Sequence, residues 1–351
     1  MFKSLRLIFG ALLLLLAHSL HTVEGSEVRP IPIIIDTDAD TDDMLAILYL
    51  LRSPLVEVRA ITTSGGGLAH YEHGAKNIAR LLELADSPHL PVAYGSKQSL
   101  SPVGSFPSEW REEVDEVMGI HLPKSVIHPV EEKAWELIER ELFNSPSKVT
   151  FFCIGPLTNI AMAIEKNPLL MDKIERIYFM GGALMVPGNI LGRPQGIRNV
   201  VAEYNIFLDA KAASIVINSG VSMTLIPMDI KEHVPITKEF FNQITSERKT
   251  ASANFLYEAI KPFAQKRTSK SYFLSPVAAT ILTHPEIATY RKLNLVVNLR
   301  KGPEYGRVMM SNQGPTVLTA TGIEPSAFYR IFLETMNLKS KAPEIFASST
   351  Q

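Results

Sequence analysis

The sequence IPIIIDTDADTDDMLAILYLL, residues Ile31 to Leu51, places an apolar run, a cluster of acids and a second apolar run in immediate succession. The β-branched triplet 33–35 is typical of a strand that is buried on both faces. The later apolar residues have the spacing of a buried helix face and are Met44, Leu45, Ile47, Leu48 and Leu51. This stretch therefore predicts a buried strand, an acidic turn and a helix.

Five carboxylates lie between the two apolar runs, at Asp36, Asp38, Asp40, Asp42 and Asp43. Because like charges repel, such a cluster costs stability unless a cation or backbone donors compensate it. The first-turn N–H groups of a helix supply part of that compensation. Ligands that are all oxygen suit a hard cation such as Ca²⁺ or Mg²⁺. The plainer alternative is a helix cap with surplus solvated acids.

Composition places the chain among ordinary globular proteins, because its 351 residues are 46% hydrophobic and 20% charged. A net charge of −1 without a basic run argues against a nucleic-acid partner. Residues 1–25 have the pattern of a secretory signal, which predicts an exported, periplasmic or secreted domain at 26–351 with no membrane span in the mature form. Cys153 is the only cysteine, so no internal disulfide is available.

Apolar β-rich runs alternate with helical patterns along the rest of the chain. Strands are predicted at 56–62, near 92, and at 148–154, 174–180 and 221–227, with a late β pair at 293–299 and 307–310. Helices are predicted at 71–85, 130–143, 237–247, 250–266, 275–283 and 325–336. This alternation predicts an α/β fold, a single-domain doubly wound and mostly parallel sheet.

In such sheets a ligand lies outside the carboxyl ends of the strands. The Asp run, the Gly65-Gly66-Gly67 run, Gly155, Gly181 and Asn205 all follow predicted strands, so they are expected to meet in one site. Segment 95–129 shows weak periodicity, and a connection of this length usually has a function, such as covering a site.

Spacing separates three families that carry such acidic runs. An EF-hand loop starting at Asp36 needs Gly at its sixth position and Glu at its twelfth, but the sequence has Thr41 and Ile47 there. A phosphatase of the haloacid dehalogenase type needs Thr or Val where Asp40 stands, and a late acidic pair, yet no Asp follows Asp229.

The run resembles instead the signature of the inosine-uridine preferring nucleoside hydrolases, Asp-x-Asp-x-x-x-Asp-Asp before an apolar helix. Segment 154–163, IGPLTNIAMA, is similar to the second signature of that family, and Met180-Gly181-Gly182 to the third. Gly188-Asn189 and segment 202–205, AEYN, complete the likeness. It implies this fold and the hydrolysis of ribonucleosides, or related N-ribosides, to ribose and free base.

The resemblance also implies roles for individual residues. Asp38, Asp43 and the backbone carbonyl of Ile154 would bind Ca²⁺, and Asp38 would deprotonate the attacking water. Asp42 would bind the ribose 2′-hydroxyl and is grouped with Asp38 as catalytic. The remaining sugar hydroxyls would be held by Asn189, Glu203 and Asn205. Related enzymes commonly form dimers or tetramers, so a homo-oligomer is an expectation too.

Two segments depart from the family pattern. Ser275 stands where members usually carry a metal-binding Asp, with Leu274 before it in place of His or Trp. Gly67 aligns with a ribose-binding Asn. With Pro276 opening the helix, Ser275 is predicted at the N-cap, where its hydroxyl either caps the helix or faces the ion.

His70, after the glycine run, is the first candidate for contacting substrate and protonating the leaving base, with His121 and His233 behind it. Tyr204 and Phe273 could stack on a base or belong to the core. Base preference would depend on segments 95–129 and 183–201. Three functions stay open: a Ca²⁺-dependent nucleoside hydrolase, a nucleoside- or sugar-binding protein on the same fold that has lost turnover, and a phosphatase.

Overall fold

The computed structural model describes residues 29–190, 198–265 and 271–339. The chain divides at Pro30, and all that follows concerns the unit Ile31–Gln351. The predicted signal at 1–25 and part of segment 183–201, residues 191–197, lie outside the described residues. Among the described residues, no helix combines the length and apolar character that crossing a membrane requires.

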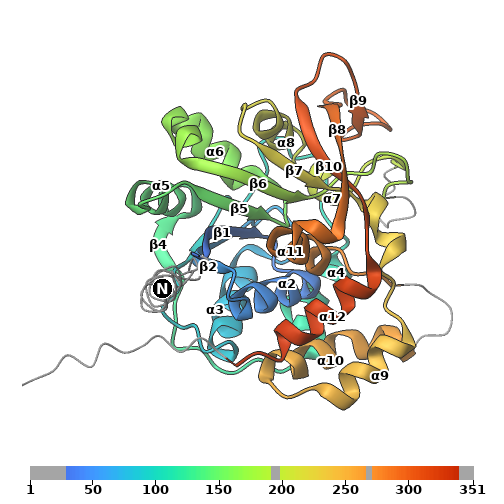
Figure 1. Ribbon diagram of the computed structural model, residues 1–351. Coiled ribbons are helices and arrows are strands. Elements are labelled where there is room, and N and C mark those ends of the chain that lie inside the picture. The colour runs from blue at the N-terminus through green and yellow to red at the C-terminus, as the bar shows by residue number, and fades with distance from the viewer. Residues whose placement is uncertain (1–28, 191–197, 266–270, 340–351) are drawn as a thin grey trace, which may run out of the picture. The chain divides into compact units, whose positions relative to one another are not determined.

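One ten-stranded sheet runs through this unit in the order β4-β3-β2-β1-β5-β6-β7-β10-β8-β9 (Figure 1). The strands are β1 Ile31–Thr37, β2 Val56–Thr63, β3 Val92–Tyr94, β4 Val130–Lys133, β5 Val149–Cys153, β6 Ile174–Met180, β7 Met223–Ile226, β8 Ala288–Val297, β9 Val308–Met310 and β10 Thr316–Ile323. Across the sheet, from β4 at one edge as far as β10, all neighbouring strands are parallel. The remaining strand pairs are antiparallel, because β8 runs antiparallel to both β10 and β9. The predicted mostly parallel α/β sheet is confirmed.

Helices cover both faces of the sheet (Figure 1). The helices are α2 Thr41–Arg52, α3 Tyr71–Leu84, α4 Ser108–Asp115, α5 Ala134–Asn144, α6 Thr158–Lys166, α7 Tyr204–Leu208, α8 Ala210–Ile217, α9 Lys238–Glu247, α10 Ala251–Gln265, α11 Ser275–Thr283 and α12 Pro325–Met336. On one face α2 packs against α10, α11 and α12, and on the other α6 packs against α5 and α8. The core between these layers includes the triplet 33–35, whose side chains are fully buried as predicted.

The strand order reverses between β1 and β5, because β1 leads through β2 to β3 on one side and β5 through β6 to β7 on the other. At such a switch point the connections leave in opposite directions and open a crevice at the carboxyl ends. The Asp run follows β1, and Ile154 follows β5, where its N–H donates to the carbonyl of Asp36 at 2.9 Å. The topology thus sets two of the predicted signatures side by side.

Helix α4 was not predicted, β8 begins five residues before its predicted start, and two further elements differ from the prediction. The helix predicted at 130–143 begins only at Ala134, because residues 130–133 form the edge strand β4 beside β3. Strand β10 was missed, although its segment TVLTATGI is rich in the β-branched residues that favour strands. It lies between β7 and β8 and joins the late β pair to the parallel sheet. Tertiary pairing therefore decided both elements.

Candidate active site

A cavity of about 360 Å³ opens at the carboxyl ends of β1, β5 and β6. Every predicted site residue except His70 lines it: Asp38, Asp42, Asp43, Ile154, Asn189, Glu203, Asn205 and Ser275. These residues come from separate elements that span more than half of the chain. The fold therefore brings residues of the Asp run and of the second and third signatures to one cavity.

Asp38 sits in the turn between β1 and α2, where Ala39 adopts a positive φ of 61°. Its Oδ2 accepts a hydrogen bond from the N–H of Leu68 at 2.8 Å, and its carbonyl accepts one from Ala69 at 3.0 Å. Two glycines permit this close approach. A Cβ on Gly67 would lie 2.1 Å from the Cβ of Asp38, and one on Gly155 would lie 2.7 Å from its backbone nitrogen. The side chain of an Asn at position 67 therefore has no room beside Asp38 with this backbone.

Asp43 is buried in the first turn of α2 and accepts hydrogen bonds at both oxygens. Thr37 donates to Oδ2 at 2.6 Å, and the hydroxyl of Ser275 donates to Oδ1 at 2.8 Å. Ser275 reaches Asp43 from α11, 232 positions later in the chain. Its hydroxyl therefore points at the acidic cluster and not at the N–H groups of its own helix, and that it faces an ion stays a prediction.

The predicted N-cap at Ser275 is wrong by one residue. Leu274 holds that position and has no capping side chain, while Ser275 is the first residue of the helix. The capping is done by Asp42 of α2, whose Oδ2 accepts hydrogen bonds from the N–H groups of Ser275 at 2.9 Å and Leu274 at 3.2 Å. A carboxylate near a helix N-terminus also interacts favourably with the helix dipole, so Asp42 joins the two helices.

The double contact of Asp42 leads to a testable expectation. Asp42→Ala should lower the free energy of unfolding by about 1–2 kcal/mol, because α11 loses its acceptor. Ca²⁺ binding should be retained, since Asp42 is not among the predicted ligands, whereas ribose binding should weaken. Chemical denaturation and titration with Ca²⁺ and ribose measure the three effects. Loss of Ca²⁺ in this variant equal to that in an Asp43 variant would show that the roles of Asp42 and Asp43 are misassigned.

Burial governs the electrostatics of the acidic residues. It raises the pKa of Asp38, Asp42 and Glu203 to about 7 each, and that of Asp43 well above its usual range. The charge of Asp40 adds to the increase for Asp38, Asp42 and Asp43. The charge of Asp38 raises the pKa of Asp43 further, whereas a side-chain hydrogen bond with Asp43 partly lowers the pKa of Asp38. The cluster is therefore unfavourable in its fully charged form unless positive charge enters it.

Glu203, Asn205 and Asn189 form the opposite side of the cavity. Glu203 caps α7 by accepting from the N–H of Asn205 at 2.8 Å, and it also accepts from Gly182 at 2.9 Å. The side-chain amide of Asn205 donates to the carbonyls of Ile154 at 3.2 Å and Met180 at 3.1 Å. The amide oxygen of Asn189 accepts from the N–H of Tyr204 at 3.0 Å. These bonds hold three polar side chains at fixed places along one wall.

Segment 95–129 supplies another wall through Phe106, Trp110, Glu113, Val114 and Met118, as its predicted covering role requires. The ring of Phe106 stacks on that of Tyr204, with centroids 4.0 Å apart. Phe273, the other aromatic considered for base stacking, is fully buried in the core and packs against Phe240, Phe328 and Phe332.

The three candidate histidines lie elsewhere. His70 precedes α3, and its Nδ1 lies 2.6 Å from Oδ2 of Asp115, beside a neighbouring cavity of about 410 Å³. His121 lines a different cavity, against α10. His233 ends the 3₁₀ turn η3, Met228–His233. Among the described residues, none of the three lines the acidic cavity.

Sequence reasoning assigned no role to two acids of the run. Asp40 caps α2, with its Oδ1 accepting from the N–H of Thr41 at 2.6 Å, and it lines the cavity. Asp36 is fully buried and accepts from Thr62 at 2.6 Å and Asn159 at 2.7 Å. The position of Asp40 before the helical pattern was a usable signal. Nothing local marked Thr62 or Asn159 as partners of Asp36.

Within the described part of the chain, no group of three or more His, Cys, Asp or Glu side chains is arranged to hold a metal ion. The donors predicted for Ca²⁺ contain only two such side chains, Asp38 and Asp43. The rest of that set is the carbonyl of Ile154 and the hydroxyl of Ser275, which line the same cavity. All four donors are oxygen atoms, as a hard cation prefers.

The chain is similar in sequence and in structure to known proteins. A probable uridine nucleosidase of Oryza sativa subsp. japonica is 31% identical over 265 residues, which cover 74% of this chain and 79% of that protein. A purine-preferring ribonucleoside hydrolase from Gardnerella vaginalis superposes with a TM-score of 0.75 at 27% identity, over 88% of this chain and 99% of that one. A plant nucleoside hydrolase shares the fold with a TM-score of 0.77, at 24% identity and the same coverage.

The sequence model of the inosine-uridine preferring nucleoside hydrolase family matches residues 33–330. This range includes nearly the whole sheet and all the cavity residues named above. The chain therefore belongs to the inosine-uridine preferring nucleoside hydrolase family, whose members are hydrolases of N-glycosyl compounds.

Proposed function

We propose that this protein hydrolyses ribonucleosides, or related N-ribosides, to ribose and free base, with Ca²⁺ as its cofactor. The observation that carries the proposal is the convergence of Asp38, Asp43, Ile154 and Ser275 with Asn189, Glu203 and Asn205 around one cavity. Family membership supplies the reaction class. The signal-like segment 1–25 adds the proposal that the enzyme works after export.

The chemistry of the donor set supports a hard divalent cation at Asp38, Asp43, the carbonyl of Ile154 and the hydroxyl of Ser275. Burial raises the pKa of both carboxyl groups, so a cation between them would restore their charged forms. When bound, Ca²⁺ would act as a Lewis acid toward water and orient the ribose hydroxyls.

The residues of the chain account for the remaining steps. Asp38 accepts the proton of the attacking water, because one of its oxygens is held by Leu68 and the side chain lines the cavity. Asp42 accepts a hydrogen bond from the 2′-hydroxyl of the ribose. The other ribose hydroxyls are bound by Asn189, Glu203 and Asn205. Cleavage of the N-glycosidic bond passes through an oxocarbenium-like sugar cation, which the surrounding carboxylates stabilise. The base leaves with the electron pair of the broken bond, the oxygen of water bonds to the sugar carbon, and in net the base gains the proton that Asp38 removes from water. The aromatic wall of Phe106, Trp110 and Tyr204 excludes water and offers apolar contact.

A panel of nucleosides tests this proposal. The relatives named above include a uridine nucleosidase and a purine-preferring hydrolase, so the panel must contain both uridine and purine nucleosides. We expect ribose release from at least one of them with Ca²⁺ present, and its loss after chelation with recovery on re-addition of Ca²⁺. Absence of ribose from every substrate would refute the proposal.

The same assay separates a binding protein from an enzyme. The substitution of an acid by Ser275 leaves the metal with two carboxylates, and this is the observation that favours a protein without turnover. Binding of a nucleoside in calorimetry, together with no ribose from any nucleoside of the panel, would support that alternative.

Ser275→Asp tests the metal assignment from the opposite direction. Its carboxylate would face Oδ1 of Asp43, which now accepts the serine hydroxyl at 2.8 Å. In chelator the new like-charge pair should lower the melting temperature, whereas in Ca²⁺ the third carboxylate should tighten binding about tenfold or more.

Ser275→Asn is the matched control for that substitution, because it changes size in the same way without adding charge. Titration with Ca²⁺ and thermal unfolding with and without chelator measure the outcome. Equal Ca²⁺ affinity in Ser275→Asp and wild type would place the ion away from residue 275.

A further inference from the structure

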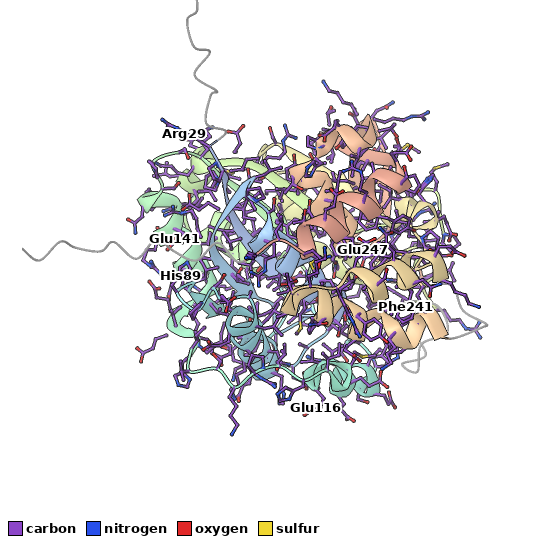
Figure 2. All side chains as sticks on the ribbon, turned by 60° about the horizontal axis from the view of Figure 1, so that its bottom comes forward. Arg29, His89, Glu116, Glu141, Phe241 and Glu247 are labelled. Carbon is purple, nitrogen blue, oxygen red and sulfur yellow. The ribbon has the colours of Figure 1, made fainter. Side chains whose placement is uncertain are left out.

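Helix α4 presents two different faces to the rest of the protein. Trp110, Glu113 and Val114, spaced at i, i+3 and i+4, line the cavity. Arg111 and Asp115, spaced at i and i+4, make hydrogen bonds to residues 65–70, which we name the 65–70 loop. Figure 2 shows Glu116, the C-cap residue that follows α4, at the edge of the structure in that view. One helix thus touches both the substrate cavity and this loop.

Arg111 binds backbone carbonyls of the loop with its guanidinium group. Its Nε donates to the carbonyl of Leu68 at 3.0 Å, and its Nη2 donates to those of Ala69 at 3.1 Å and Gly65 at 3.5 Å. Burial lowers the pKa of Arg111, and the carboxylates of Asp115 and Asp38 act in the opposite direction. The fixed fork of an arginine suits this use, since it reaches several acceptors at once.

Asp115 binds the far end of the same loop. Its Oδ1 accepts from the backbone N–H of His70 at 2.8 Å, and its Oδ2 lies 2.6 Å from Nδ1 of the His70 ring. Asn77 of α3 donates to the carbonyl of Asp115 at 2.7 Å. Asp115 is only 9% exposed, so these bonds are shielded from solvent. His70 therefore belongs to the attachment of α4.

The loop in turn holds Asp38. The N–H of Leu68 binds the Asp38 carboxylate, and the next N–H, of Ala69, binds the Asp38 carbonyl. Two successive peptide units are therefore fixed at both ends. The carbonyls of Leu68 and Ala69 bind Arg111, while the N–H groups of Ala69 and His70 bind Asp38 and Asp115.

We propose that Arg111 and Asp115 are positioning residues that hold the 65–70 loop in the conformation that orients Asp38. Helix α4, which forms one wall of the substrate cavity, is then linked through the 65–70 loop to Asp38, the carboxylate that activates water. This inference deepens the proposed function and rests on it for the role of Asp38. A looser loop would leave Asp38 without its fixed donor, and misplacement of a catalytic group by about 1 Å costs on the order of 100-fold in rate.

Arg111→Met removes the three carbonyl contacts and keeps most of the side-chain length. We expect kcat for ribose release to fall about 10- to 100-fold while KM changes by less than about threefold, because orientation of the catalytic group is lost and sugar contacts remain. Arg111→Lys should recover part of kcat, since an ammonium can donate but lacks the rigid fork.

Arg80→Met is a matched control from the same region. Arg80 also donates to backbone carbonyls of segment 95–129, those of Leu122 at 2.8 Å and Pro123 at 3.2 Å, and to Asn77. It anchors the end of that segment to α3 rather than to the 65–70 loop. Its loss should leave kcat and KM within about threefold of wild type, as expected for contacts remote from the reacting groups.

Hydrogen exchange of the backbone amides supplies a readout that needs no activity. In the free protein, the amides of residues 65–70 should exchange faster in Arg111→Met and in Asp115→Asn than in wild type. In Arg80→Met their exchange rates should equal those of wild type. Should Arg111→Met fail to fold, Arg111→Lys and Asp115→Asn carry the same comparison.

Three outcomes would overturn the inference. They are unchanged exchange at 65–70 in the Arg111 and Asp115 variants, a rise in KM with unchanged kcat, and an equal loss of kcat in Arg80→Met. If wild type releases no ribose from any nucleoside, the proposed function fails, and the exchange comparison still decides whether α4 controls the loop around Asp38.

Discussion

Asp38→Asn should reduce kcat for ribose release by about 10³-fold. Asn keeps the shape of the side chain and can still accept the hydrogen bond from the N–H of Leu68, so the turn between β1 and α2 is retained. It cannot take a proton from water at neutral pH, and it is a weaker ligand for a hard cation than a carboxylate. Initial rates of ribose release at saturating nucleoside and Ca²⁺ measure the loss.

Asp40→Asn is the comparison for Asp38→Asn, because it removes one charge from the same acidic run. Asp40 lines the cavity but caps α2, and it is neither the proposed base nor a proposed ligand. We expect its kcat to fall by less than about tenfold. Equal losses in both variants would mean that the summed negative charge, and not a base at position 38, supports catalysis.

Asp43→Asn should abolish Ca²⁺ binding and, with it, the stabilisation that Ca²⁺ gives. In wild type, Ca²⁺ at 100 times its Kd should raise the free energy of unfolding by about 2.7 kcal/mol, and in the variant by nothing measurable. In chelator the variant should unfold at the same temperature as wild type or above it. The reason is that burial and the nearby carboxylates raise the pKa of Asp43, which shows that its charged form is unfavourable in the fold.

Calorimetric titration with Ca²⁺ and thermal unfolding, each with and without chelator, test the Asp43 prediction. Retained stoichiometric Ca²⁺ binding in Asp43→Asn would contradict the ligand set. A melting temperature in chelator far below that of wild type would instead show that the contacts of Asp43 with Thr37 and Ser275 are chiefly structural.

Local pattern carried much of the fold. The apolar triplet 33–35, the acids and the helical spacing after them predicted β1 and α2, and the structure has both. Helix α12 also begins at Pro325 and ends at Met336, as predicted. In contrast, residues 130–133 were assigned to a helix and β10 was not predicted. The four-residue strand at 130–133 depends on a neighbouring strand for its hydrogen bonds, so its own sequence is a weak guide. The β-branched residues of β10 were, in contrast, a usable signal.

Residue identities and spacing were enough to predict the chemistry of the site: which carboxylates lie in the turn after β1, which glycines follow the strands, and which family the motifs resemble. The partners of those groups became known from the folded chain. Asp42 caps α11, the N–H of Leu68 holds Asp38, and Arg111 and Asp115 hold the loop that contains Leu68.

The difference arises from how far apart in the chain the interacting residues lie. Periodicity reports the burial of a strand or helix face, because that depends on residues a few positions apart. The contacts of Asp42 and Asp38 join segments 233 and 30 positions apart, and most of them use backbone N–H or carbonyl groups that every residue carries. Their partners are therefore set by strand order and helix placement, and by nothing in the identity of the residues that supply them.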